Sequence, residues 1–148
     1  MDWLKDLFTN PFLLTGVSSW FIAQVLKTIL HLIMYKKLDF ERLYGDGGMP
    51  SGHSATVSSL ATICGLYCGF NSVEFAISAV LAIIVCHDAT GVRRETGRHA
   101  EILNQLVKSL ETGEPVDLKE LVGHTPLQVF AGMLIGIGNA ILMYFVIL

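Results

Sequence analysis

Long apolar segments dominate this chain and restrict the folds that it can adopt. They cover residues 11–35, 51–70, 73–89 and 125–148, and each approaches the length of about 20 residues that a helix needs to cross a bilayer. The composition agrees, because 52% of the 148 residues are hydrophobic and the mean hydropathy is +0.55. A bilayer offers no water to backbone groups, so each span must be helical. The sequence therefore predicts one all-α domain, residues 1–148: an integral membrane helical bundle of about four transmembrane helices.

A soluble bundle of completely buried helices is the alternative. The last apolar segment argues against it, because Gln128 and Asn139 are its only strongly polar side chains between Leu127 and Leu148. A helix that is apolar on all sides is typical of a membrane span.

The connections between the spans set the expected topology. Asn71 and Ser72 form so short a link that the second and third spans must make a hairpin. Both long loops, residues 36–49 and 91–123, then lie on one side of the membrane and both termini on the other. The loops hold most of the basic residues, namely Lys36, Lys37, Arg42, Arg93, Arg94, Arg98, Lys108 and Lys119, against Lys5 on the far side. The positive-inside rule places the loops in the cytoplasm, and we expect a prokaryotic cell membrane.

The second loop contains a predicted amphipathic helix over residues 94–112. One stripe of this helix is apolar and charged residues lie opposite, the stripe being Ala100, Leu103, Leu106, Val107 and Leu110. This pattern indicates a cytoplasmic or interfacial helix, which Gly113 and Pro115 would end.

Residues 47–54 carry the strongest functional signal. They read Gly-Gly-Met-Pro-Ser-Gly-His-Ser and open the second span. The free N–H groups and partial positive charge of a helix start attract phosphate. A histidine at this position can act as acid, base or nucleophile near neutral pH. A capped helix after a glycine turn explains these residues equally well on their own.

Further ionisable residues gather at the same membrane face in this topology. Asp88, Arg93 and Arg94 follow the third span, and His124 opens the fourth. Arginine binds phosphate bidentately, and paired histidines can supply a nucleophile and an acid. These residue types suit phosphoryl transfer without a metal ion. The simpler interpretation is that the arginines anchor a span and the histidines cap helices.

The motifs resemble a known superfamily. Pro50-Ser51-Gly52-His53, then Arg93/Arg94, then Gly123-His124-Thr125-Pro126 are similar to motifs of the type-2 phosphatidic acid phosphatases and vanadium haloperoxidases. The chain most resembles the small divergent membrane branch of that superfamily, from residues 20–27 to the last span.

The resemblance implies roles for particular residues. His124 would be the nucleophile that forms a phosphohistidine, and His53 the acid that protonates the leaving group. Ser51, Gly52 and either Arg93 or Arg94 would hold the substrate phosphate. Lys27 is the best match to the first family motif, although a lysine in a span can also extend along it to reach water.

Two departures from the family pattern affect the site. The aspartate expected four residues after the nucleophilic histidine is Gln128, which can hold an imidazole N–H but cannot stabilise an imidazolium by charge. Asp88 could supply the carboxylate if it folds near His124. The arginines also stand much earlier in the chain than the family pattern has them.

The leading prediction is a metal-independent, cofactor-free membrane phosphatase that hydrolyses a lipid-type phosphomonoester or diphosphate. The alternative, which Gln128 favours, is a non-catalytic carrier or scaffold that binds phospholipid or phosphate. Expected partners are the lipid phosphate substrate and membrane lipids; the mild net charge of -3 gives no indication of nucleic acid. Gly132 and Gly136 have the small-xxx-small spacing of close helix contacts, within the bundle or in a homodimer.

Overall fold

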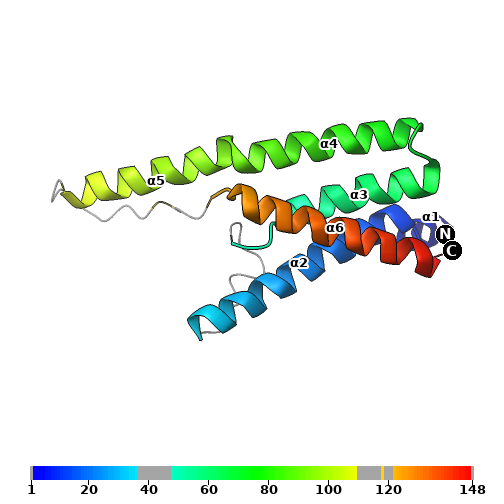
Figure 1. The fold of residues 1–148 in the computed structure, drawn as a ribbon, viewed down its shortest axis with the longest axis horizontal. Helices are drawn as coiled ribbons and strands as arrows, with labels where there is room; N and C mark the ends of the chain where they lie inside the picture. The colour runs from blue at the N-terminus through cyan, green and yellow to red at the C-terminus, as the bar shows by residue number, and fades with distance from the viewer. Residues whose placement is uncertain (1, 37–47, 110–117, 119–121, 148) are drawn as a thin grey trace.

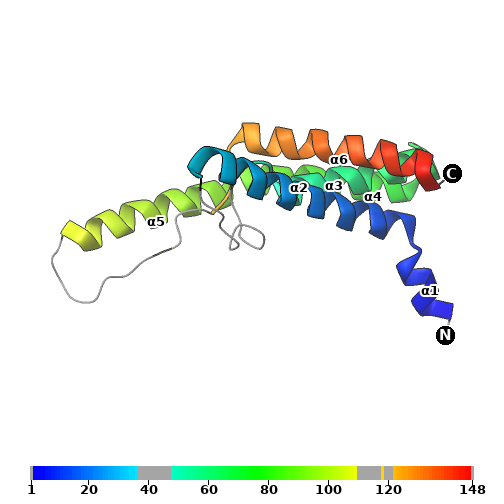
Figure 2. The same cartoon turned by 90° about the horizontal axis from the view of Figure 1, so that it is seen from below.

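The computed structural model describes residues 2–36, 48–109, 118 and 122–147, and its regular elements are helices. In chain order these are α1 (Asp2–Phe8), α2 (Pro11–Tyr35), α3 (Gly52–Cys68), α4 (Val73–Thr90), α5 (Val92–Ser109) and α6 (Pro126–Ile147) (Figure 1). Helix α1 and the last turn of α6 lie at the same end of the bundle (Figures 1 and 2), as the predicted hairpin topology requires.

Short polar side chains fix where the helices begin. Asn10 starts α2, since its side-chain oxygen accepts hydrogen bonds from the backbone N–H groups of Phe12 (3.0 Å) and Leu13 (3.1 Å). Ser72 starts α4 in the same way, accepting from the N–H of Phe75 over 3.1 Å. These bonds satisfy donors that the first helical turn leaves unpaired.

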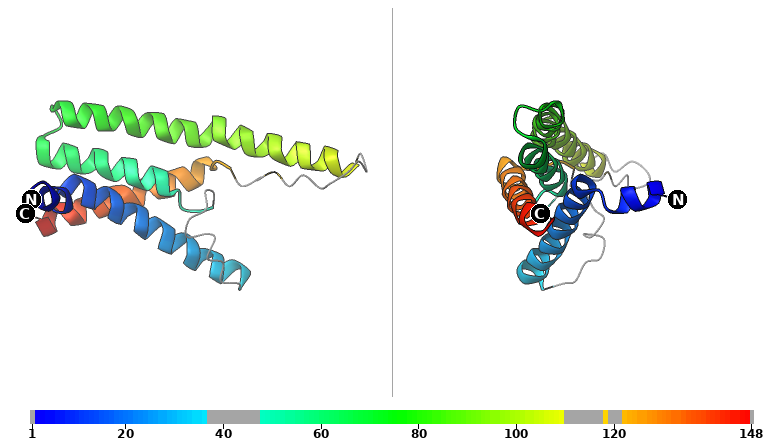
Figure 3. Two further views of the ribbon diagram at one scale, coloured as in Figure 1. Left: turned by 180° about the vertical axis from the view of Figure 1, so that it is seen from behind. Right: turned by 90° about the vertical axis from the view of Figure 1, so that its right-hand side faces the viewer.

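Helix α3 lies at the centre of the bundle. It packs against α2, α4 and α6, and the end-on view in Figure 3 shows it between α4 and the other two helices. Gly132 and Gly136 of α6 lie directly against the backbone oxygens of Ser51 and Ala55, leaving no room for a Cβ atom at either glycine. The small-xxx-small spacing therefore serves packing within the bundle. A homodimer stays a prediction.

The outer surface of the bundle is rich in large apolar side chains, as a bilayer requires. Ile77 and Phe145 are 65% and 74% exposed, whereas Thr15 and Ser19 are fully buried. Buried polar groups join the helices: Asn139 of α6 donates hydrogen bonds to the hydroxyl oxygens of Ser18 (2.9 Å) and Ser19 (2.8 Å) on α2. Small residues and interhelical hydrogen bonds are typical of packing inside membranes. The predicted all-α membrane bundle is confirmed.

Helix length and composition identify fewer spans than the four that the sequence predicts. Within the described residues, three helical stretches are long and apolar enough to cross a membrane, at 11–35, 73–108 and 126–146. Helix α3, predicted as the second span, has 17 residues and is not among them. Most of its residues are buried or half-buried against other helices, so it can carry serine and glycine in place of large apolar residues. Its crossing of the membrane stays a prediction.

Helix α5 continues almost in line with α4 and projects beyond the bundle (Figures 1 and 2). It begins at Val92, and residues 110–112 of the predicted amphipathic helix lie outside the described residues. Asn104 exchanges two hydrogen bonds with the backbone of Leu118, at 2.9 and 3.0 Å. Because α5 extends the line of a span, it projects away from the bundle, and its cytoplasmic or interfacial placement stays a prediction.

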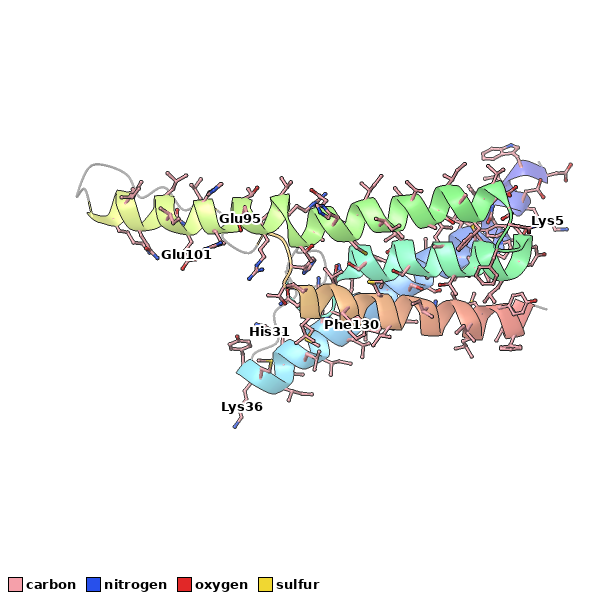
Figure 4. All side chains as sticks on the ribbon, turned by 45° about the horizontal axis from the view of Figure 1, so that its top comes forward. Lys5, His31, Lys36, Glu95, Glu101 and Phe130 are labelled. Carbon is pink, nitrogen blue, oxygen red and sulfur yellow. The ribbon has the colours of Figure 1, made fainter. Side chains whose placement is uncertain are left out.

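The side chains in Figure 4 show how the two ends of the bundle differ. Lys5 lies at the end that holds the termini, whereas Lys36 lies at the opposite end and Glu95 and Glu101 lie on the projecting α5. Most of the first predicted loop, residues 37–47, lies outside the described residues.

Candidate active site

The start of α3 is fastened to α6 and presents His53. Ser51 caps α3: its Oγ accepts a hydrogen bond from the N–H of Ser54 over 3.3 Å. The N–H of Ser51 donates to the carbonyl oxygen of Gln128 over 3.0 Å. His53 follows in the first helical turn, with its side chain exposed. The cap thus holds the histidine at the positive end of a helix.

Backbone contacts also fix His124. Its N–H donates to the carbonyl oxygen of Ala89 over 2.9 Å, which ties the segment before α6 to the last turn of α4. The preceding Gly123 has a φ of 85°, and a Cβ there would overlap the backbone of Arg93 and Arg94. Glycine alone tolerates both this left-handed conformation and this close approach. His124 is consequently buried, with 5% of its surface exposed.

His53, Arg93 and His124 line one small cleft, here called the histidine cleft. Its other lining residues are Val85, Ala89, Val122 and Gly123. Thus α3, α4, α5 and the segment before α6 all contribute, although they are far apart in the sequence. The cleft has a volume of about 20 Å³, which is room for a water molecule. A phosphate group needs the exposed side chains of His53 and Arg93 to move outward.

Arg93 is paired with Asp88 at the rim of this cleft. Its Nε donates to Oδ2 of Asp88 over 2.6 Å, with 49% and 38% of the two side chains exposed. The bond orients the guanidinium group, although a pair this exposed adds little to stability. Arg94 does not line the cleft. Of the two arginines that the sequence left open, the structure brings Arg93 to the histidines.

Gln128 has a local structural role at the start of α6. Its side-chain oxygen accepts a hydrogen bond from the N–H of Thr125 over 2.9 Å, and its own N–H donates to Oγ1 of Thr125 over 3.4 Å. This reciprocal pair is a capping box, for which threonine and glutamine three residues apart are suited. The amide oxygen that could have held His124 is therefore used to begin α6.

The other predicted phosphate ligands do not line the histidine cleft. Ser51 is fully buried, and Gly52 is packed against Trp20 and Gln24 of α2. Lys27 is 4% exposed, so it lies inside the bundle rather than along its surface. Phosphate binding by Ser51, Gly52 and Lys27 stays a prediction.

Sequence reasoning missed three apolar residues of the cleft, Val85, Ala89 and Val122. Ala89 also supplies the carbonyl oxygen that positions His124. Lining the cleft has no sequence signal, because small apolar residues are common throughout these spans. Positioning His124 through a backbone oxygen has none either, because that oxygen is the same in every residue.

The fold and the cleft define a helical membrane protein in which two histidines and an arginine meet near one end of the bundle. The chain belongs to the Divergent PAP2 family, which it matches over residues 8–139, a range that includes the whole histidine cleft. It is 41% identical to "Uncharacterized membrane protein YuiD" of Bacillus subtilis (strain 168), and the match covers 89% of this chain and 92% of the relative. The superfamily indicated by the motifs is thus confirmed. No solved structure matches the chain.

Proposed function

We propose that this protein is a metal-independent membrane phosphatase that hydrolyses a lipid phosphomonoester or diphosphate through a phosphohistidine. The observation that carries the proposal is the shared cleft of His53, Arg93 and His124. Membership of the Divergent PAP2 family supports a phosphatase-related function.

The reaction has two steps. An imidazole nitrogen of His124 attacks phosphorus while the bond from phosphorus to the leaving oxygen breaks. Protonated His53 gives its proton to that oxygen, and the lipid alcohol or lipid phosphate departs. A water molecule then attacks the phosphohistidine, transferring a proton to His53. The phosphorus–nitrogen bond breaks, which releases phosphate and restores both histidines.

Positive charge at the cleft would stabilise both transition states. The guanidinium group of Arg93 can bind two phosphate oxygens at once. His53 lies in the first turn of α3, where the helix dipole favours negative charge. These groups supply the electrostatic stabilisation that phosphoryl transfer needs.

The orientation belongs to the same proposal. The site and the two long loops face the cytoplasm of a prokaryotic cell, because the loops hold most of the lysines and arginines and Lys5 lies at the opposite end (Figure 4). Cytoplasmic loops carry this excess of positive charge.

A non-catalytic phospholipid- or phosphate-binding protein is the second candidate. It is favoured because Gln128 and Asp88, the two side chains that the sequence suggested for orienting His124, form other bonds. Gln128 caps α6 through Thr125, and Asp88 binds Arg93. Both of these side chains are thus bonded to residues other than His124.

Phosphate release from a panel of lipid phosphates and diphosphates tests the proposal. The purified full-length protein is assayed in EDTA beside His124→Ala and His53→Ala. Release by the wild type that disappears in His124→Ala, with a phosphohistidine trapped after acid-free quenching, is expected. Binding of inorganic phosphate without release across the panel would favour the carrier or scaffold.

A further inference from the structure

A wide apolar groove begins beside the histidine cleft. It runs along the outer, lipid-facing side of α2 and α3 and has a volume of about 420 Å³, within the range of sites that hold small molecules. From α2 it is lined by Phe12, Leu13, Gly16, Val17 and Trp20. We call it the apolar groove.

Two residues belong to both hollows. His53 and Val85 line the histidine cleft and the apolar groove, and Thr56, Val57 and Leu60 continue the groove along α3. The groove therefore starts at the imidazole of His53, which protonates the leaving oxygen in the proposed reaction. A chain attached to the leaving oxygen would enter the groove directly.

The groove is about 12 Å long, because Phe12 and Trp20 at its two ends are separated by about two turns of α2 at a rise of about 1.5 Å per residue. Trp20 marks the end near the histidines, since it packs against Gly52 at the start of α3. Phe12 marks the other end, where its ring meets Tyr67 edge-to-face with centroids 5.4 Å apart.

We propose that the apolar groove binds one hydrocarbon chain of the lipid whose phosphate enters the histidine cleft. This inference rests on the proposed function for the identity of the headgroup. The chain slides in sideways from the bilayer, because Leu13 and Val17 are 45% and 54% exposed on the lipid-facing surface. The protein therefore acts on long-chain phosphates resident in the membrane, and Phe12 limits how deeply the chain reaches.

Photolabelling tests the location of the chain without requiring turnover. The probe is hexadecyl phosphate with a diazirine near the middle of its chain, added to the full-length protein in lipid nanodiscs. We expect labels in residues 12–20 of α2 and 56–60 of α3, reduced by excess unlabelled hexadecyl phosphate. Labels spread over the outer faces of all spans, without such competition, would overturn the proposal.

A matched pair of variants tests the same groove through selectivity. Val17→Trp fills the groove, whereas Val80→Trp places the same ring on α4 at a similarly exposed position, 56% against 54%. In Val17→Trp the kcat/KM ratio of hexadecyl phosphate to butyl phosphate should fall about tenfold, and in Val80→Trp it should keep the wild-type value. An equal ratio in both variants contradicts the groove.

The two proposals can fail separately. Groove labelling without phosphate release rejects hydrolysis and retains the lipid site. Phosphate release without groove labelling rejects the groove and retains the phosphatase.

Discussion

The Nε atom of Arg93 donates a hydrogen bond to Oδ2 of Asp88 over 2.6 Å, across the junction of α4 and α5. The carboxylate of Asp88 is therefore bonded to Arg93, the arginine that lines the histidine cleft. A charged hydrogen bond of this length holds the guanidinium plane in one orientation, so we expect Asp88 to act on the proposed site through Arg93.

Replacing Arg93 tests its proposed contact with phosphate. Arg93→Lys keeps the charge but loses the planar fork, so the Kd of inorganic phosphate should rise about tenfold. Isothermal titration calorimetry on the purified protein measures this change. Arg94→Lys is the matched control, because Arg94 is adjacent but does not line the cleft, and its Kd should stay within about twofold of wild type. Equal losses in both variants would contradict the assignment.

Gln128 should matter more for stability than for chemistry. Gln128→Ala removes the oxygen that accepts from the Thr125 N–H, and the free energy of unfolding should fall by about 1 kcal/mol. Gln128→Glu keeps an acceptor at the helix start and should change stability by less than about 0.5 kcal/mol. Denaturant titration in detergent measures both, with the exposed Gln105→Ala as control. A large loss of phosphate release in Gln128→Ala with stability intact would instead assign Gln128 to His124.

Gly123 should tolerate no side chain. Gly123→Ala adds a Cβ at a φ of 85° and against the backbone of Arg93 and Arg94, so unfolding free energy should fall by about 2–4 kcal/mol. The backbone displacement that this clash forces also moves the N–H of His124 away from the carbonyl oxygen of Ala89. Gly138→Ala is the control, since nothing lies within 4 Å of its added Cβ. Its free energy of unfolding should rise by about 0.5–1 kcal/mol, because alanine favours a helix more than glycine does. Similar thermal stability of the two variants would contradict the close contact.

The polar contact between α6 and α2 should contribute to bundle stability. Asn139→Ala removes hydrogen bonds to Ser18 and Ser19 and should lower the unfolding free energy by about 1 kcal/mol. Leu142→Ala, at a lipid-facing position that is 61% exposed, should change it less. Steric-trap or denaturant unfolding in micelles compares the two. A smaller loss for Asn139→Ala than for Leu142→Ala would show that the contact does not stabilise the fold.

The sequence by itself determined the fold class and several local features. Long apolar segments have one solution in a bilayer, the helix, and a cap such as Ser51 depends on residues within one turn. The motif around His53 and the spacing of Gly132 and Gly136 are also local patterns, so both could be recognised in the chain.

Only the tertiary structure decided which side chains meet. Arg93 and Arg94 look alike in the sequence, but adjacent residues of a helix point about 100° apart, and packing of Gly123 on their backbone brings Arg93 alone to the histidines. The sequence allows Gln128 to face His124, but in the structure its side-chain oxygen accepts a hydrogen bond from the N–H of Thr125. The apolar groove joins α2 to α3 across a long loop. Such contacts arise from how whole helices pack against one another, which no local pattern encodes.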